Sequence, residues 1–255
     1  MLQNHQTSLI RQPCGEGIQR IAIVKWEKFY SDTLRRCVEN TIPSAKISVF
    51  RTASEMLATL RSEPAHLGLI ELTLPDMDGL DLLAIICDER LIHRLLVVSD
   101  RSDERSRLAL RFASINGIFD FNVESFDDLP KAIRCVADGG CYRNAHPRSA
   151  GLRGAACGAR LDQLLSPEEL EVFAVLGDGS SDEKAGEQLG ICAETVHSKR
   201  KRIMRRLGVQ SRTDLMVEAI RRGVVRVGQD RTLRPGFERD LAVRARRSTA
   251  AARAG

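Results

Sequence analysis

The chain has 255 residues, of which 43% are hydrophobic and 29% charged, a globular composition that suffices for two domains with separate cores. No apolar run approaches the roughly 18 to 20 residues that span a bilayer, and the polar first residues lack the apolar core of a signal peptide. These features argue against a disordered, fibrous or membrane-spanning protein. We expect a cytoplasmic protein with no membrane partner.

The net charge of +5 accumulates late in the chain. Residues 1–159 are balanced, residues 160–228 carry a slight basic excess, and the rest of the excess lies in residues 229–255. This placement indicates a polyanionic partner for the carboxyl half. The seven cysteines form no C-x-x-C pair and no Cys/His cluster, so we expect no metal site and no cofactor.

Composition and periodicity divide the chain into five segments. We predict a flexible amino terminus, an α/β domain, a Gly/Ala/Arg-rich linker, a helical domain and an Arg/Ala-rich disordered tail, at residues 1–17, 18–140, 141–160, 161–228 and 229–255.

In the α/β domain, short apolar runs alternate with amphipathic segments such as 29–41 and 125–140. The runs are too short for helices, and several are rich in branched residues. This alternation predicts a doubly wound parallel sheet of five strands with helices on both faces. The expected strands lie at residues 21–24, 47–50, 67–70, 95–98 and 117–119.

The crevice of such a sheet lies beyond the carboxyl ends of its strands. The residues that follow the expected strands are therefore the site candidates: Lys25, Trp26, Glu71, Ser99, Asp100, Asp120 and Phe121. No glycine-rich phosphate loop follows the first strand, and no G-x-S-x-G elbow is present in the sequence. We expect no catalytic residues and no enzyme activity.

The helical domain has clear cap signals. Ser166, Pro167 and Glu169 form a capping box with proline at the first helical position, and Ser211 with Asp214 forms another. Between them we expect a short helix from Ser181 to Leu189, then a strongly basic one within residues 191–209. Two short helices joined by a glycine-containing turn, the second one basic, are typical of a helix-turn-helix that binds DNA. The alternative is that the basic run is only a solvated helix face.

Residues 165–215 resemble the LuxR-type helix-turn-helix of NarL/FixJ response regulators, an all-α four-helix module. The resemblance implies base contacts from His197, Ser198 and Lys201, with the last helix serving in dimerisation. Departures from the family pattern at Ala185, Gly186 and Cys192 predict weaker packing and a weaker cap. The implied phosphate contacts come from Ser181, Thr195, Lys199 and Arg205.

The first domain resembles a CheY-like receiver through the string ELTLPDMDG, residues 71–79, where the family has D-x-x-x-P-x-M-D-G. Glu71 occupies the phosphoacceptor position. Lys25 and Trp26 replace the metal-binding acids, Phe121 replaces the lysine, and the hydroxyl survives as Ser99. Phosphoryl transfer needs the metal and the cation, so the resemblance implies a degenerate receiver that is not phosphorylated.

Three hypotheses remain for Glu71. It forms a partly buried ion pair with Lys25, it is a solvated acid at a strand end, or it imitates a phosphorylated aspartate by extending toward Ser99.

These features predict a sequence-specific transcription regulator of the response-regulator type, independent of phosphorylation. It would bind double-stranded promoter DNA as a homodimer. The alternative is a protein-interaction adaptor, in which the receiver-like domain docks a partner protein and DNA binding is weak.

Overall fold

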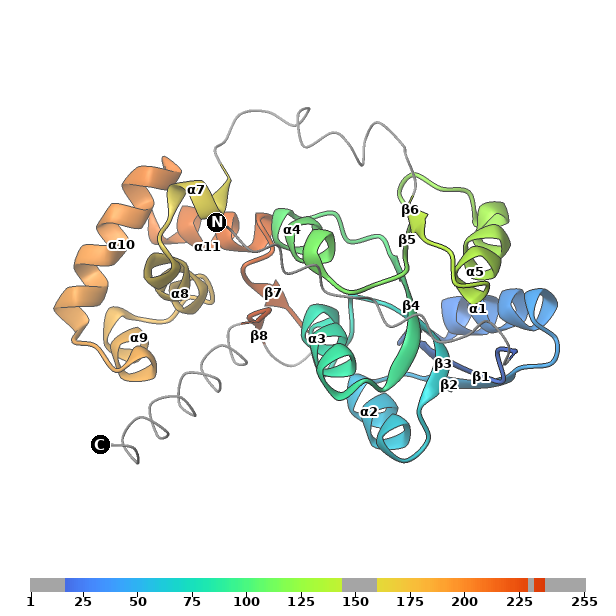
Figure 1. The fold of residues 1–255 in the computed structure, drawn as a ribbon. Coiled ribbons are helices and arrows are strands. Elements are labelled where there is room, and N and C mark those ends of the chain that lie inside the picture. The colour runs from blue at the N-terminus through green and yellow to red at the C-terminus, as the bar shows by residue number, and fades with distance from the viewer. Residues whose placement is uncertain (1–16, 144–159, 229–231, 237–255) are drawn as a thin grey trace, which may run out of the picture.

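The computed structural model describes residues 17–143, 160–228 and 232–236, which form an α/β domain and a helical domain (Figure 1). Residues 1–16 and 237–255 lie outside the described residues, and so do Cys14 and Cys157. The predicted flexible amino terminus and the part of the predicted disordered tail beyond residue 236 therefore remain predictions. Within the described ranges, no helix is long and apolar enough to cross a membrane.

The α/β domain alternates strands and helices along the chain, as its hydrophobic pattern predicts. Its strands are β1 (Arg20–Val24), β2 (Lys46–Phe50), β3 (Ala65–Ile70), β4 (Ile92–Ser99), β5 (Gly117–Asp120) and β6 (Tyr142–Arg143). Its helices are α1 (Lys28–Thr41), α2 (Ala53–Ser62), α3 (Gly79–Glu89), α4 (Glu104–Phe112), the 3-10 turn η1 (Phe126–Asp128) and α5 (Leu129–Ala137).

All six strands pair in parallel, in the order β2-β1-β3-β4-β5-β6. The order reverses at β1 and β3, which are direct neighbours although α1, β2 and α2 separate them in sequence. The carboxyl ends of these two strands therefore meet at the switch point of a doubly wound sheet, where such folds place their sites.

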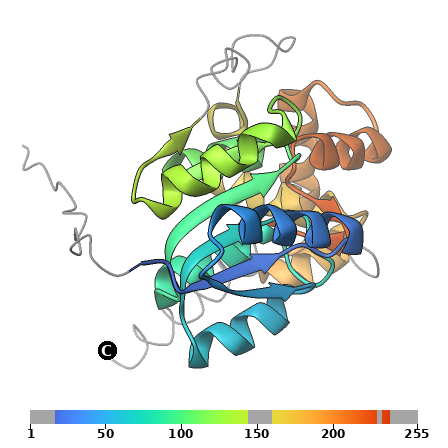
Figure 2. The same cartoon turned by 90° about the vertical axis from the view of Figure 1, so that its right-hand side faces the viewer.

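Alternate residues of each central strand enter different cores, because successive side chains of a strand point to opposite faces. In β1, Ala22 and Val24 pack with residues of α2 and α3, whereas Ile21 and Ile23 pack with residues of α1 and α5. Figure 2 shows α1 and α5 on one side of the sheet and α2 on the other. Both faces are covered, which explains why the strands appear as continuous apolar runs.

The predicted doubly wound parallel sheet is confirmed, and it has one short strand more than the five that we predicted. Tyr142 and Arg143 form β6, which pairs with β5 at the sheet edge. The Tyr142 hydroxyl donates a hydrogen bond to Glu124, 2.6 Å away. A two-residue strand has too little pattern to be recognised in sequence, and it lies within the segment 141–160 that we predicted as linker.

The helical domain comprises α7 (Leu161–Leu164), α8 (Pro167–Leu176), α9 (Asp182–Leu189), α10 (Ala193–Leu207) and α11 (Arg212–Arg221). The capping boxes predicted at Ser166 and Ser211 are both formed, and Ser181 caps α9. Gly190 and Gly208 end α9 and α10 in the left-handed conformation. The basic helix α10 therefore lies between the two glycines that end α9 and α10.

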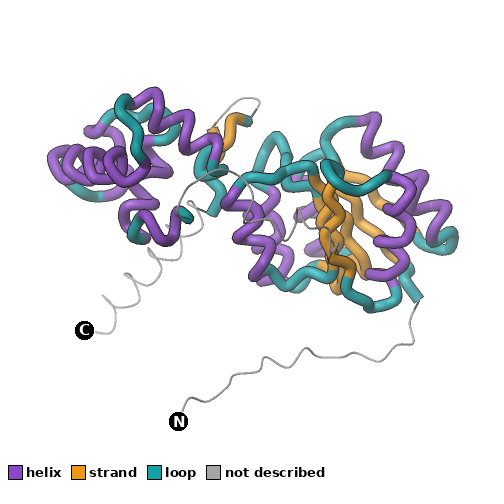
Figure 3. Tube along the Cα trace, turned by 90° about the horizontal axis from the view of Figure 1, so that it is seen from above, coloured by secondary structure: helices purple, strands orange, loops and turns teal. Residues whose placement is uncertain are grey.

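A short hairpin follows the helices. β7 (Arg226–Val227) pairs antiparallel with β8 (Thr232–Leu233), so part of the segment 229–255, predicted as disordered tail, is a strand. Figure 3 shows this hairpin beside the helical domain, apart from the large sheet. It brings Arg226 and Gly236 to the first domain, as the site contacts below show.

Candidate functional site

Glu71 follows β3 at the switch point and is completely buried. Its Oε1 accepts three hydrogen bonds, from Ser99 Oγ at 2.5 Å and from the backbone N–H groups of Leu72 at 2.6 Å and Thr73 at 3.1 Å. Its Oε2 accepts from Lys25 Nζ at 2.7 Å. Both carboxylate oxygens are therefore occupied by protein donors.

Lys25, the residue after β1, supplies the positive charge of this pocket and is itself 7% exposed. Besides Glu71, its ammonium contacts Glu27 Oε2 at 3.2 Å and lies 5.3 Å from the centre of the Tyr30 ring. Burial alone lowers the pKa of Lys25, but the charges of Glu71 and Glu27 and hydrogen bonds to them raise it above its ordinary value. Lys25 therefore stays charged at neutral pH.

The structure decides between the sequence hypotheses for Glu71 in part. The solvated-acid hypothesis is wrong because none of the side chain is exposed. The contact with Lys25 and the contact with Ser99 are both present, one at each carboxylate oxygen, so these two hypotheses are compatible. Sequence reasoning overlooked Glu27, which directly follows Lys25 and Trp26.

The remaining predicted pocket residues lie around this centre. Phe121 packs edge-on against Phe119 with ring centres 5.3 Å apart, and its backbone N–H donates to the Ser99 carbonyl at 3.1 Å. Trp26 is half-buried, and its carbonyl accepts from Arg51 at 3.2 Å. Phe121 thus fills its position with an apolar ring where a cation would be needed.

A polar chain leads from the pocket to the helical domain. Ser99 Oγ accepts from the Arg101 N–H at 3.2 Å, and Arg101 Nη1 donates to Asp78 Oδ2 at 2.5 Å.

Asp78 also caps α3 through the Leu80 N–H and is 2% exposed. Its Oδ2 lies 3.2 Å from Arg226 Nε of the hairpin, and Arg226 Nη2 donates to the Leu74 carbonyl at 2.6 Å. Nothing in the sequence indicated Arg226 as the partner of Asp78.

Glu104 makes a second connection between the domains. Its Oε1 accepts from the Leu161 N–H at 2.8 Å, and its Oε2 accepts from Arg222 Nη1 at 2.8 Å. The Arg105 N–H donates to the Arg222 carbonyl at 3.2 Å, and the Gly236 N–H donates to Asp81 at 2.8 Å. One carboxylate at the start of α4 therefore holds both the first and the last helix of the helical domain.

The basic helix α10 packs through Val196 and Ile203, both completely buried, as the predicted inward face requires. Ser198, Lys201 and Arg205 are exposed on its outer side, and among the described residues none of these three has an ion-pair partner. In Figure 1, α10 lies on the side of the helical domain away from the sheet. This face is accessible and positively charged.

The other predicted DNA-contact residues, on α10 and at the start of α9, are already paired within the domain. Lys199 Nζ donates to Glu168 at 2.6 Å, and His197 Nδ1 lies 3.2 Å from Asp182. The Thr195 hydroxyl lies 3.0 Å from the Cys192 sulfur, and the Ser181 hydroxyl accepts from the Lys184 N–H that it caps. These side chains are positioned by neighbours on α8, α9 and the turn.

The departures from the family pattern at Gly186 and Cys192 have different structural outcomes. Cys192 caps α10 without a side-chain hydrogen bond, as expected for a thiol. Gly186, by contrast, allows a close approach: a Cβ at this position would lie 2.6 Å from the Ile191 carbonyl oxygen. The interpretation of Gly186 as only a packing loss is therefore wrong, because the glycine lets the turn between α9 and α10 fold back tightly.

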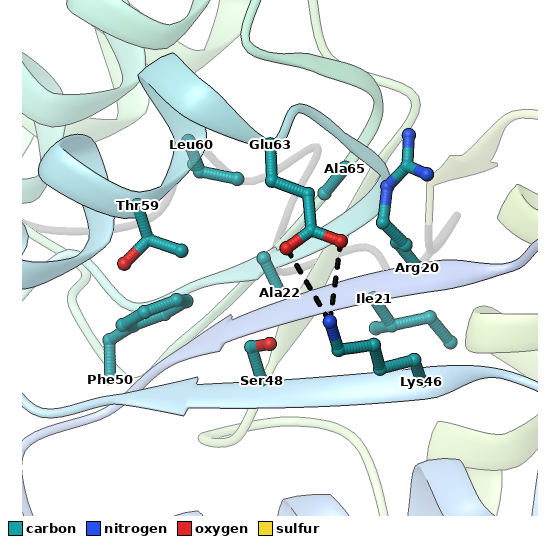
Figure 4. Close-up of a pocket in the computed structure, with 10 residues that line it drawn as sticks. All are labelled: Arg20, Ile21, Ala22, Lys46, Ser48, Phe50, Thr59, Leu60, Glu63 and Ala65. Carbon is teal, nitrogen blue, oxygen red and sulfur yellow. Dashed lines mark hydrogen bonds and ion pairs between the residues drawn. The ribbon is translucent and has the colours of Figure 1, made fainter.

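A cleft at the opposite end of the sheet is no ligand site. It has a volume of about 20 Å³, room for little more than one water molecule. Figure 4 shows that the ion pair between Lys46 and Glu63, at 3.3 Å, lies across it. Among the residues that the structure describes, no group of three or more His, Cys, Asp or Glu side chains could hold a metal ion.

Comparison with known proteins finds a family model and curated relatives that are similar to parts of the chain. Residues 163–219 match the model of the luxR family of bacterial regulatory proteins. The chain is 28% identical over 169 residues to the transcriptional regulatory protein UhpA of Escherichia coli, covering 66% of this chain and 81% of UhpA. It is 26% identical over 162 residues to the transcriptional regulatory protein MctR of Rhizobium johnstonii, covering 62% of this chain and 72% of MctR.

Solved structures share the fold. RcsB of Salmonella enterica serovar Typhimurium, bound to promoter rprA in the presence of the phosphomimetic BeF₃⁻, is 23% identical with a TM-score of 0.54. The match covers 78% of this chain and 97% of RcsB. An RcsB–DNA complex gives a TM-score of 0.52 at 21% identity, over 79% of this chain and 97% of that one.

Proposed function

We propose that this homologue of NarL/FixJ-type response regulators is a sequence-specific DNA-binding transcription regulator that works without phosphorylation. The observation that carries the DNA-binding part is the exposed basic face of α10 in a helix-turn-helix of the luxR type. Such a helix neutralises phosphates and reaches base edges in the major groove. RcsB, which shares the fold, has been solved on promoter DNA.

We assign the DNA contacts of this interface from the exposure of the side chains on α10. Ser198 and Lys201 are exposed near the middle of α10, where base edges would lie, and Arg205 is exposed one turn further on. To contact a phosphate, Lys199 must break its ion pair with Glu168. This costs little free energy, because the Glu168 side chain is 74% exposed and such surface ion pairs are weak. His197, Thr195 and Ser181 complete the proposed contact set.

The DNA affinities of variants that each lack one positive charge test the DNA-binding proposal. Fragments of genomic DNA are selected on the purified full-length protein, and affinities are measured for Lys201→Ala and for Lys131→Ala as matched control. Lys131 lies on α5, exposed, and pairs only with Asp128 among the described residues. Lys201→Ala should lose about 1 to 3 kcal/mol on the selected site. Equal affinities of both variants would contradict the proposal and favour an adaptor whose receiver-like domain docks a partner protein.

Independence from phosphorylation rests on the occupancy of the pocket. Glu71 has no oxygen without a protein donor, and the ammonium of Lys25 lies beside it at 2.7 Å. Phe121 offers no charge to hold a phosphoryl group. Incubation with acetyl phosphate and Mg²⁺ should therefore leave the mass of the protein and its DNA affinity unchanged. A phosphorylated product, or tighter DNA binding with the donor, would contradict this part.

We also propose that the protein binds DNA as a homodimer through α11. Val217 and Ile220 on this helix are 59% and 46% exposed, which is a high exposure for branched apolar side chains. A second copy of α11 would cover them, and a two-fold dimer would present two copies of α10 to two half-sites. Val217→Asp should shift the protein to monomer in sedimentation and weaken binding to a two-half-site fragment, whereas Val227→Asp on the hairpin should not.

A further inference from the structure

Asp182, the first residue of α9, connects three helices of the helical domain, namely α9, α10 and α11. It is 7% exposed although it carries a charge. Arg200 of α10 makes a two-pronged contact with it, Nε to Oδ1 at 3.0 Å and Nη2 to Oδ2 at 2.9 Å. Arg212 of α11 donates to Oδ1 at 2.6 Å. One carboxylate therefore holds two arginines of the DNA-binding module within the protein.

The same cluster fixes the chemistry of His197. Arg200 Nη2 lies 2.8 Å from His197 Nδ1, and Asp182 Oδ2 lies 3.2 Å from it. A guanidinium nitrogen only donates, so His197 Nδ1 accepts from Arg200 and the ring proton resides on Nε2. Nε2 therefore presents an N–H.

His197 is exposed on the same side of α10 as Ser198 and Lys201. Within the described part of the chain, no protein group accepts a hydrogen bond from its Nε2. In the major groove, guanine, thymine and adenine offer acceptors, whereas cytosine offers only an amino donor. An obligatory N–H at this position therefore disfavours cytosine.

We propose that Asp182 is a positioning residue that raises the sequence discrimination of this module. It acts in two ways: through Arg200 it keeps His197 a hydrogen-bond donor, and it withholds Arg200 and Arg212 from DNA phosphates. Phosphate contacts strengthen binding to every sequence alike, so withholding them lowers non-specific affinity. This inference rests on the proposed DNA binding.

The test compares full-length wild type, Asp182→Ala and Asp182→Asn on a selected fragment and on a random duplex of the same length. Releasing two arginines should steepen the salt dependence of random-duplex binding by about 0.9 for each new phosphate contact. The ratio of specific to random affinity should fall by about tenfold in Asp182→Ala. Asp182→Asn, which keeps an acceptor but loses the charge, should fall between.

Glu187→Gln is the matched control, because Glu187 is an exposed acid on the same helix. It removes one negative charge without releasing an arginine. If the Asp182 variants bind like Glu187→Gln, the positioning role is wrong. If wild type shows no preference for any fragment, the proposed function itself fails, and the two failures are thus distinct.

Arg200→Ala keeps the test decisive if the Asp182 variants do not fold. It frees His197 Nδ1 to carry the proton, so selected sites should newly accept cytosine at one position, without a steeper salt dependence. Unchanged base preferences in a folded Arg200→Ala protein would overturn the inference.

Discussion

Arg226, in the hairpin beyond the helix-turn-helix, forms an ion pair with Asp78 of the receiver-like domain, with Nε and Oδ2 3.2 Å apart. Asp78 is connected through Arg101 and Ser99 to Glu71. Glu71 and the hairpin formed by β7 and β8 are therefore the two ends of one buried polar chain. A change at either end alters the surroundings of charges that have little access to water, where electrostatic interactions are strong.

Arg226→Ala should loosen the contact between the domains. It removes a charge-assisted hydrogen bond to Leu74 and the pair with Asp78, contacts of about 1.5 to 3 kcal/mol each for charged groups. Backbone N–H groups that cross the boundary, those of Arg105, Leu161 and Gly236, should exchange with solvent roughly tenfold faster or more. Hydrogen exchange resolved by residue measures this.

The exposed pair of Lys131 and Asp128 supplies a control for that experiment, since Lys131→Ala removes a charge far from the boundary. Unaltered exchange at all three crossing amides in Arg226→Ala would show that the hairpin does not hold the domains together.

Lys25→Met should destabilise the receiver-like domain by about 3 to 5 kcal/mol, because it leaves Glu71 charged and buried without its cation. The double variant Lys25→Met/Glu71→Leu should recover much of this loss, because no unpaired charge remains. Trp26 is the only tryptophan of the chain and adjoins the pair, so its fluorescence in urea follows this domain. A single variant as stable as wild type would contradict the ion-pair account.

Alkaline pH should weaken the same domain through Lys25. The folded-state pKa of this residue is raised above its ordinary value by Glu71 and Glu27, which outweigh burial. The contribution of Lys25 to stability is therefore complete below its unfolded pKa of roughly 10.4 and is lost as pH rises through the higher folded pKa.

The difference in unfolding free energy between wild type and Lys25→Met/Glu71→Leu, followed from about pH 8 to about pH 11.5, isolates this term from the other lysines. The unfolding free energy of the wild type minus that of the double variant should stay level at first and then fall as the pH rises. If this value rises with pH instead, the predicted sign is wrong.

The change in stability on Gly186→Ala shows whether helix propensity or the tertiary contact of Gly186 has the larger effect. Helix propensity alone predicts a gain of about 1 kcal/mol for alanine within α9. The structure predicts a loss of about 1 to 3 kcal/mol, since the new Cβ would lie 2.6 Å from the Ile191 carbonyl oxygen. Thermal unfolding followed by circular dichroism decides between them, with Glu187→Ala on the exposed side of the same helix as control.

The sequence by itself determined the local features of this protein. The short apolar runs predicted the parallel sheet, and in the structure their alternate residues enter two cores. The capping boxes at Ser166 and Ser211 predicted where two helices begin. Both signals depend on residues within a few positions of one another. The adjacency of Lys25 and Glu71 also followed from sequence, because strand order in a doubly wound sheet is strongly restricted.

Only the tertiary structure decided which distant charges meet. Asp78 and Arg226 lie more than a hundred residues apart in the sequence, and so do Glu104 and Arg222. No periodicity connects such residues, because their contact depends on how two separately folded domains pack. The same holds for Asp182 and Gly186. The sequence does not distinguish a buried aspartate that binds two arginines from an exposed one. The effect of a glycine on stability depends on the atoms that a Cβ at its position would contact.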